Sequence, residues 1–137
     1  MRSIADGAQD TEFAHRVVLQ LPPTTTAPRI AREAVTAFVD LCPDEALDRL
    51  RLILSELVTN SVRHARLDPA DMIVVRLSAC AGRLMGSVYD AGEPFGGVSA
   101  EREPDPSPGG FGLHIVSSLA HDWGIREGNG NEVWFEL

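Results

Sequence analysis

The stretch LSELVTNSVRHA, Leu54 to Ala65, decides the fold of this chain. Apolar residues recur through it, and through the residues before it, at the spacing of a helix that turns about 100° per residue. This pattern predicts a long helix that ends near Ala65 or Arg66. We expect the apolar face of this helix to lie on a sheet, and the residues that share the face are Leu47, Leu50, Leu54, Leu57, Val58 and Ser61.

Glu56 and Asn60 lie four residues apart on a second stripe of the same helix, beside Ile53 and His64. At the rim of a core a carboxylate is partly desolvated, which favours its acceptance of a proton. An amide oxygen one turn further on is a hard ligand of the kind that Mg²⁺ prefers. The alternative is that Glu56 pairs with a nearby arginine at a solvated edge and that Asn60 has no special role. The helix alone does not decide between the two.

The rest of the chain reads as short elements around this helix. We expect residues 1–12 to be a loose tail and residues 13–137 to form a single domain. The fold class that follows is α/β, an α+β two-layer sandwich with a mainly antiparallel sheet and helices on one face. The patterns predict strands at 13–21, 72–79, 84–89, 123–126 and 132–137, and further helices at about 30–41 and 111–120.

Asp90 stands at the end of a predicted strand and is followed two residues later by Gly92. A carboxylate fixed by a strand end can accept a hydrogen bond from an exocyclic amine such as that of adenine. A glycine beside it lets a flat ring approach, because no Cβ is in the way. The alternative interpretation of Asp-Ala-Gly is an ordinary turn.

The run PGGFGL, Pro108 to Leu113, leads glycines directly into a predicted helix. Backbone N–H groups at the start of a helix form an anion site that needs no lysine. The alternative is a hinge followed by a helix start. Between this run and Ala91 no periodicity is visible, and a loop of that length in a small domain is usually functional or disordered.

The composition excludes several classes of protein. A formal net charge of −8 argues against a nucleic-acid binder, whose affinity comes from clustered Lys and Arg. All 12 basic residues are arginine, which excludes a Schiff-base lysine and the lysine of a GxxxxGK[ST] phosphate loop. Cys42 and Cys80 have no metal-site spacing. We expect a cytoplasmic chain, because neither a signal peptide nor a membrane-spanning run is apparent.

Taken in order, the three segments resemble the N box and the two glycine boxes of the GHKL ATPase superfamily, which has the Bergerat nucleotide-binding fold. The form SELVTNSVRHA, DAGEPF and GGFGLHIVSSLAHDWGI looks most like the anti-sigma-factor serine/threonine kinases. The resemblance runs from about Phe13 to Leu137. It is specific for the fold and less specific for the activity.

The resemblance implies a role for each matching position on the long helix. Glu56 falls where the family has its general base, and Asn60 where it has its Mg²⁺ ligand. Arg63 and His64 fall where side chains touch the nucleotide in related domains. From the residues alone, Arg63 could equally be a solvated surface arginine and His64 a packed ring at the end of the helix.

The other matching positions would surround the base and the phosphates of ATP. Asp90 falls on the aspartate that reads adenine, with Gly92 beneath the base. The phosphate-binding turn and helix start match Gly110, Gly112 and Leu113, and the residues from Glu93 to Gly109 correspond to the lid.

The sequence departs from the family pattern in three places. Pro94 stands where the second glycine of the first glycine box is expected, and the lid has no lysine. Near the end of the chain, Gly130-Asn131 occupies a place where Gly-Thr is common. The expected hydroxyl near the adenine site is therefore missing unless Asn131 substitutes for it.

The resemblance implies an ATP- and Mg²⁺-dependent protein serine/threonine kinase. Its substrate would be an anti-sigma factor antagonist of the STAS type, and its alternative partner a sigma factor, so that the two compete in a partner switch. A homodimer is expected from the resemblance alone. The alternative is a non-catalytic binding module that sequesters a regulatory partner, with or without nucleotide. A sensor histidine kinase would need a histidine-bearing dimerisation helix pair, which we do not expect in this chain.

Overall fold

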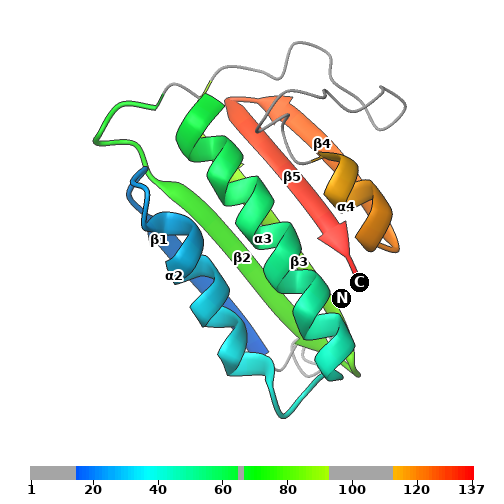
Figure 1. Cartoon of the computed structure of the whole chain (residues 1–137). Coiled ribbons are helices and arrows are strands. Elements are labelled where there is room, and N and C mark those ends of the chain that lie inside the picture. The colour runs from blue at the N-terminus through cyan, green and yellow to red at the C-terminus, as the bar shows by residue number, and fades with distance from the viewer. Residues whose placement is uncertain (1–14, 65–66, 93–112) are drawn as a thin grey trace, which may run out of the picture.

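The structure, a computed structural model, describes residues 15–64, 67–92 and 113–137. Five strands form one sheet in the order β1-β2-β3-β5-β4, and all four pairings between them are antiparallel (Figure 1). In chain order the elements are β1 (His15–Leu21), α2 (Ala27–Ala34), the 3₁₀ turn η1 (Val35–Phe38), α3 (Asp44–His64), β2 (Ile73–Cys80), β3 (Arg83–Asp90), α4 (Leu113–Leu119), β4 (Asp122–Gly128) and β5 (Gly130–Glu136).

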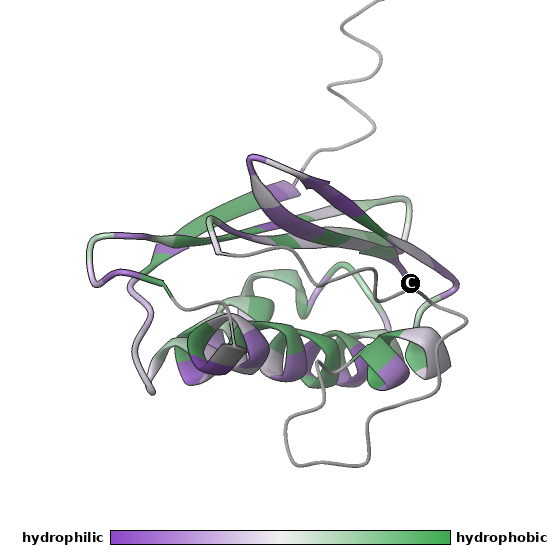
Figure 2. Cartoon of the chain, turned by 90° about the horizontal axis from the view of Figure 1, so that it is seen from above, coloured by the Kyte–Doolittle hydropathy of each residue, from purple (hydrophilic) through white to green (hydrophobic). Residues whose placement is uncertain are grey.

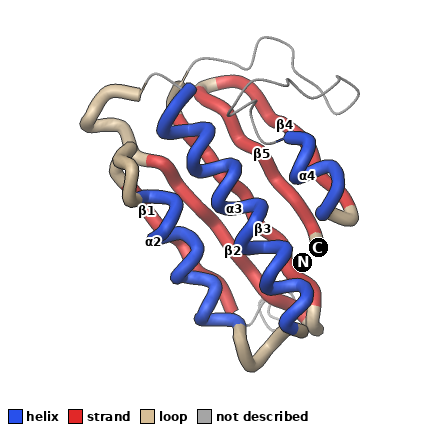
Figure 3. The backbone as a smooth tube through the Cα atoms, viewed as in Figure 1, coloured by secondary structure: helices blue, strands red, loops and turns tan. Residues whose placement is uncertain are grey.

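The described helices all lie on one face of the sheet. Seen from above, the strands form one layer and the helices form a second layer below it (Figure 2). The tube view shows α3 across the middle of the sheet, with α2 on its β1 side and α4 over the β4–β5 end (Figure 3). The described residues thus confirm the expected two-layer sandwich with an antiparallel sheet.

Helix α3 is the central element of the helical layer. Pro43 precedes it, and Asp44 and Glu45 stand in its first turn, where negative charge complements the helix dipole. The six residues expected on its sheet-facing side are all buried, at 0–5% exposure. Ile53 is also fully buried, although the sequence pattern placed it on the neighbouring stripe. The apolar face of α3 is therefore wider than the leucine spacing alone indicates.

Strands β2 and β3 form a hairpin through Ala81 and Gly82, as the sequence predicts. Both turn residues have positive φ, 51° for Ala81 and 80° for Gly82. Left-handed backbone at both central positions is typical of the two-residue turn whose twist matches that of paired strands. Along β2 the buried and more exposed residues alternate, because one face of the sheet contacts the helices and the other does not.

Helix α2 differs from the helix that the spacing of Ile30 to Leu41 predicts. Its α-helical part ends at Ala34 and the chain continues as η1. Ala27, Ala31, Val35 and Phe38 are fully buried, whereas Ile30 is 39% exposed. Small alanines therefore face α3 and the sheet, and the larger apolar side chain of Ile30 points outward. Among the described helices, none is both long and apolar enough to cross a membrane.

Candidate functional site

Asp90 is the last residue of β3 and is only 3% exposed. Its carboxylate accepts hydrogen bonds from three described groups. The Ser61 hydroxyl of α3 lies 2.6 Å from Oδ2, and the backbone N–H of Gly92 lies 2.9 Å from Oδ1. The third donor is the amide of Asn131, with Nδ2 at 3.3 Å from Oδ1. A buried carboxylate is costly unless it is hydrogen-bonded, and these donors offset that cost.

Asn131 takes the position at which the sequence lacks the expected hydroxyl. It is 2% exposed and is the cross-strand partner of Asp90 in the pairing of β3 with β5. Besides Asp90, its Nδ2 contacts the carbonyl oxygen of Gly92 at 3.3 Å. Because both neighbours are acceptors, the NH₂ end of the amide must face them. The position where the family commonly has a hydroxyl is thus occupied by an amide that donates to Asp90.

The hairpin between β4 and β5 holds Asn131 close to Asp90. Gly130 has φ of +110°, and a Cβ at this position would collide with the Asp90 carbonyl oxygen and with the Tyr89 ring. The Tyr89 hydroxyl in turn donates to the carbonyl oxygen of Asn129 at 2.7 Å. Glycine is therefore required at Gly130 by both its backbone conformation and the close approach of β3.

Asn60 precedes Ser61 on α3 and is 4% exposed. Both side-chain atoms of its amide are buried, and neither has a hydrogen-bond partner among the described residues. Burying a polar group without a partner costs on the order of 1–3 kcal/mol. An unpaired amide oxygen of this kind fits a hard cation such as Mg²⁺, whose preferred ligands are oxygens. Glu56, one turn earlier on the helix, is partly exposed.

The structure brings Asn60, through its neighbour Ser61, and Asp90 together on the helical side of the sheet. The side chain of Arg63 is exposed, and it makes no hydrogen bond or ion pair with the described residues. Leu113 is buried at the start of α4, which packs against α3. The side chain of His64, the glycines at 110 and 112, and the predicted lid at 93–109 lie outside the described residues.

Ser61 is the functional candidate that sequence reasoning missed. The helical pattern places it on the apolar face of α3, where a small polar residue is interpreted as a packing residue of the core. In the structure its hydroxyl reaches a carboxylate 29 positions later in the chain. The signal that could have found it is a hydroxyl next to Asn60 on a face that is otherwise entirely apolar.

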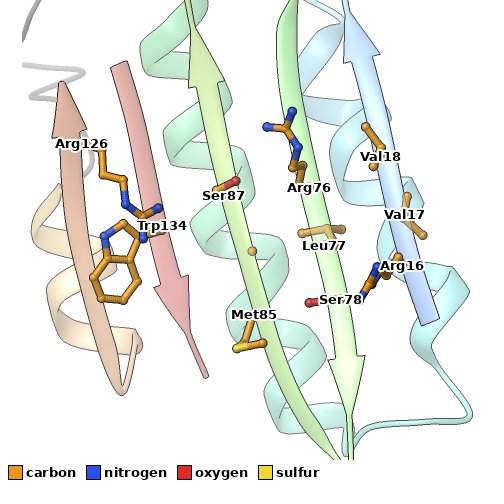
Figure 4. A pocket seen from close by; sticks show the side chains of 11 residues that line it. Arg16, Val17, Val18, Arg76, Leu77, Ser78, Met85, Ser87, Arg126 and Trp134 are labelled. Carbon is orange, nitrogen blue, oxygen red and sulfur yellow. The ribbon is translucent and has the colours of Figure 1, made fainter. Parts of the chain in front are cut away.

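A shallow groove lies on the opposite face of the sheet, which carries none of the described helices. Its wall at the β4–β5 end is the Trp134 ring, with the Arg126 guanidinium 5.4 Å from the ring centre (Figure 4). Arg126 also pairs with Glu132 at 2.8 Å. Ser87 and Met85 of β3 line the groove, whereas Asp90 has the opposite parity on that strand and faces the helices. The groove and the Asp90 site are therefore on different faces.

Comparison with known proteins places this architecture in a family. Residues 21–137 match the histidine kinase-like ATPase domain family. The chain belongs to this family, and the resemblance to GHKL ATPases seen in the sequence is confirmed. No curated protein matches the chain in sequence.

Two solved structures share the fold at low sequence identity. One is the crystal structure of the RsbU and RsbW domains of Rv1364c from Mycobacterium tuberculosis, with TM-score 0.68 and 20% identity over 89% of this chain and 32% of that one. The other is the histidine kinase domain from the blue-light activated histidine kinase of Erythrobacter litoralis EL346, with TM-score 0.55 and 21% identity over 85% of this chain and 60% of that one. This chain spans less than two thirds of either protein.

Proposed function

We propose that this chain binds Mg·ATP on the helical side of the sheet and transfers the γ-phosphoryl group to a serine or threonine of a partner protein. Membership of an ATPase domain family supports the nucleotide. The observation that carries the proposal is the buried Asn60 amide, which lacks a partner among the described residues and lies one turn from Glu56. A buried amide without a partner is costly in the free protein, and a ligand that engages it would remove the cost.

In this proposal Asp90 receives the exocyclic amine of adenine, and Gly92 leaves room for the base. The Asn60 oxygen would hold Mg²⁺, which would neutralise charge on the phosphates. Glu56 is exposed enough to meet a partner's hydroxyl and accepts its proton. A bond then forms between that hydroxyl oxygen and the γ-phosphorus, the bond from the γ-phosphorus to the bridging oxygen breaks, and ADP leaves.

The partner we propose is an anti-sigma factor antagonist of the STAS type, with a sigma factor as the competing partner. The structural similarity to a protein described as having RsbU and RsbW domains supports this choice. We place such a switch in the cytoplasm, and propose that the chain pairs as a homodimer as related kinases do. The single-domain organisation of residues 13–137 and the phosphate-binding role of residues 110, 112 and 113 belong to the same proposal.

Phosphate transfer from labelled ATP to a candidate STAS-type antagonist tests the proposal. Glu56→Gln removes the base and should lower the transfer rate by about 10²–10⁴-fold while Mg·ATP still binds. The matched control is Asp48→Asn, which makes the same change at an exposed acid of the same helix. Equal rates for the native protein and Glu56→Gln would overturn the catalytic assignment of Glu56.

Calorimetry with Mg·ATP separates the kinase from the alternative of a binding module. Binding without phosphate transfer to any candidate partner would favour a nucleotide-gated regulator. Failure of millimolar Mg·ATP to release heat or to raise the unfolding temperature would overturn nucleotide binding itself, because a ligand that binds only the folded state must stabilise it.

A further inference from the structure

The acceptor capacity of the Asp90 carboxylate is nearly filled by the protein itself. An ionised carboxylate offers about four acceptor positions, two on each oxygen. Among the described residues, Oδ1 receives two donors, the Gly92 N–H at 2.9 Å and the Asn131 amide at 3.3 Å. Oδ2 receives one donor, the Ser61 hydroxyl at 2.6 Å. After these donors from the described part of the chain, one position, on Oδ2, is left for a ligand.

We propose that Asn131 is a specificity-determining residue that makes this site reject guanine nucleotides in favour of adenine nucleotides. The inference rests on the proposed nucleotide site, and it concerns the choice of base rather than the transfer reaction. Its basis is that Asn131 occupies the second position on Oδ1, so that the two carboxylate oxygens cannot both receive a donor from the ligand.

Adenine and guanine present different hydrogen-bonding groups to a carboxylate. Adenine presents one exocyclic amine beside a ring nitrogen that accepts, so it asks for only one acceptor position on the carboxylate. Guanine presents two adjacent donors, the ring N1–H and the exocyclic amine, which match the two oxygens of a carboxylate together. With Oδ1 of Asp90 filled, one guanine donor remains unpaired in a buried site, and leaving a buried donor unpaired is strongly unfavourable.

The three donors to Asp90 therefore have different consequences when they are removed. Loss of the Asn131 amide opens one position on Oδ1 beside the one already open on Oδ2, which is the arrangement that guanine requires. Loss of the Ser61 hydroxyl opens a second position on Oδ2 and none on Oδ1. Ser61→Ala should weaken both nucleotides without changing the preference between them.

Asn131 is well placed to act through this contact and not through the ligand's phosphates. It is 2% exposed, pairs with Asp90 across β3 and β5, and binds the carbonyl oxygen of Gly92 with the same nitrogen. The amide thus fixes the carboxylate and the glycine turn relative to each other. The amide at this position occupies one acceptor position on Oδ1 of Asp90.

The test is the ratio of the dissociation constants of Mg·GDP and Mg·ADP, measured by calorimetry so that no turnover occurs. We expect the native chain to prefer ADP. Asn131→Leu, which keeps the approximate volume but cannot donate, and Asn131→Ala should both lower the ratio by about tenfold or more. Ser61→Ala is the matched control and should leave the ratio within about twofold. Thermal unfolding of each variant without nucleotide shows that the domain is folded.

The outcomes separate this inference from the proposed function. If the native chain prefers ADP and both Asn131 variants keep the same ratio, the role of Asn131 in base choice is wrong and nucleotide binding stands. An equal fall of the ratio in Ser61→Ala would also overturn the inference, because general loosening of the site would then explain it. If the native chain binds neither nucleotide, the proposed function fails and the inference fails with it.

Discussion

The Ser61 hydroxyl lies 2.6 Å from Oδ2 of Asp90 and joins the central helix to the end of β3. Both residues are buried, at 5% and 3% exposure. The contact spans two layers of the fold, so that any shift of α3 along the sheet would stretch it. It therefore couples the position of Asn60, the preceding residue of the helix, to the carboxylate proposed to read the base.

Ser61→Ala should lower the free energy of unfolding by about 1.5–3 kcal/mol, because it removes a hydrogen bond to a buried charged group. Chemical denaturation without nucleotide measures the loss. Ser55→Ala is the matched control, since the hydroxyl of Ser55 accepts from Arg32 at 2.9 Å in a part-buried place. Ser55→Ala should lower the free energy of unfolding by less than Ser61→Ala does. A cost for Ser61→Ala no larger than that of Ser55→Ala would show that the contact contributes little.

Asn60→Leu should have opposite effects on stability and on nucleotide binding. Without nucleotide, the variant should be as stable as the native chain or more stable by about 1 kcal/mol, because an apolar side chain replaces a buried amide that has no described partner. Stabilisation by Mg·ATP in a thermal unfolding assay should disappear. A clear destabilisation of the free protein would mean that the amide has a structural partner.

Much of the fold follows from the sequence, because its elements obey simple periodicities. The leucine stripe predicts α3 to within a few residues, and alternation predicts β2 and β3. The packing of α2 was harder to predict. Ala27 and Ala31 face the core while Ile30 is exposed, since closely packed helices need small residues at the contact and a pattern search favours large ones.

The site was only partly predictable, for a physical reason. Glu56, Asn60 and Asp90 stand in local motifs, each of which can be recognised from a single short stretch of sequence. The contacts of Ser61 and Asn131 with Asp90 depend on how α3 lies across the sheet and on the register between β3 and β5. No local pattern contains that information. The sequence marks Asn131 only as the residue that stands where a hydroxyl is expected. It does not show that Asn131 contacts Asp90.

Ala81→Asn should stabilise the domain by about 1 kcal/mol. Ala81 has φ of 51°, a left-handed conformation that asparagine tolerates better than alanine, and Asn-Gly is the preferred pair in this kind of hairpin turn. Thermal denaturation measures the gain. Ala81→Val is the opposing variant and should destabilise, because a β-branched residue is disfavoured at positive φ. Equal stabilities for the two variants would contradict the assigned turn.

Gly124→Ala should displace the Trp134 ring from the open face of the sheet. A Cβ at Gly124 would lie 2.6 Å from Nε1 of Trp134, so the indole must move, at a cost of about 1–3 kcal/mol. The change should appear in the fluorescence of Trp134, recorded in a Trp123→Phe background. Gly128→Ala, where a Cβ would meet nothing within 4 Å, is the control. An unchanged spectrum for Gly124→Ala would show that the ring is not held there.

The two cysteines should differ in reactivity. Burial raises the pKa of the Cys42 thiol, so that less of the reactive thiolate is present at a given pH, whereas Cys80 is partly exposed. At pH 8, iodoacetamide should modify Cys42 roughly tenfold more slowly than Cys80, as mass spectrometry of peptides would show. Similar modification rates of the two cysteines in denaturant provide the control.

Because the thiol of Cys42 ionises at a lower pH in the unfolded chain than in the folded one, the stability associated with neutral Cys42 should fall as the pH rises above about 8.5.

The helix-free face of the sheet has a practical consequence. Val18 is 59% exposed on that face (Figure 4). Ser61, Asn60 and Glu56 come from α3, which lies on the other side of the sheet. A sensor-chip linker attached through Val18→Cys, in a background without Cys80, would hold the domain by the face opposite the described helices. A dye could be attached at the same position. Nucleotide and partner proteins could then be titrated onto the helical side of an immobilised molecule without obstruction from its support.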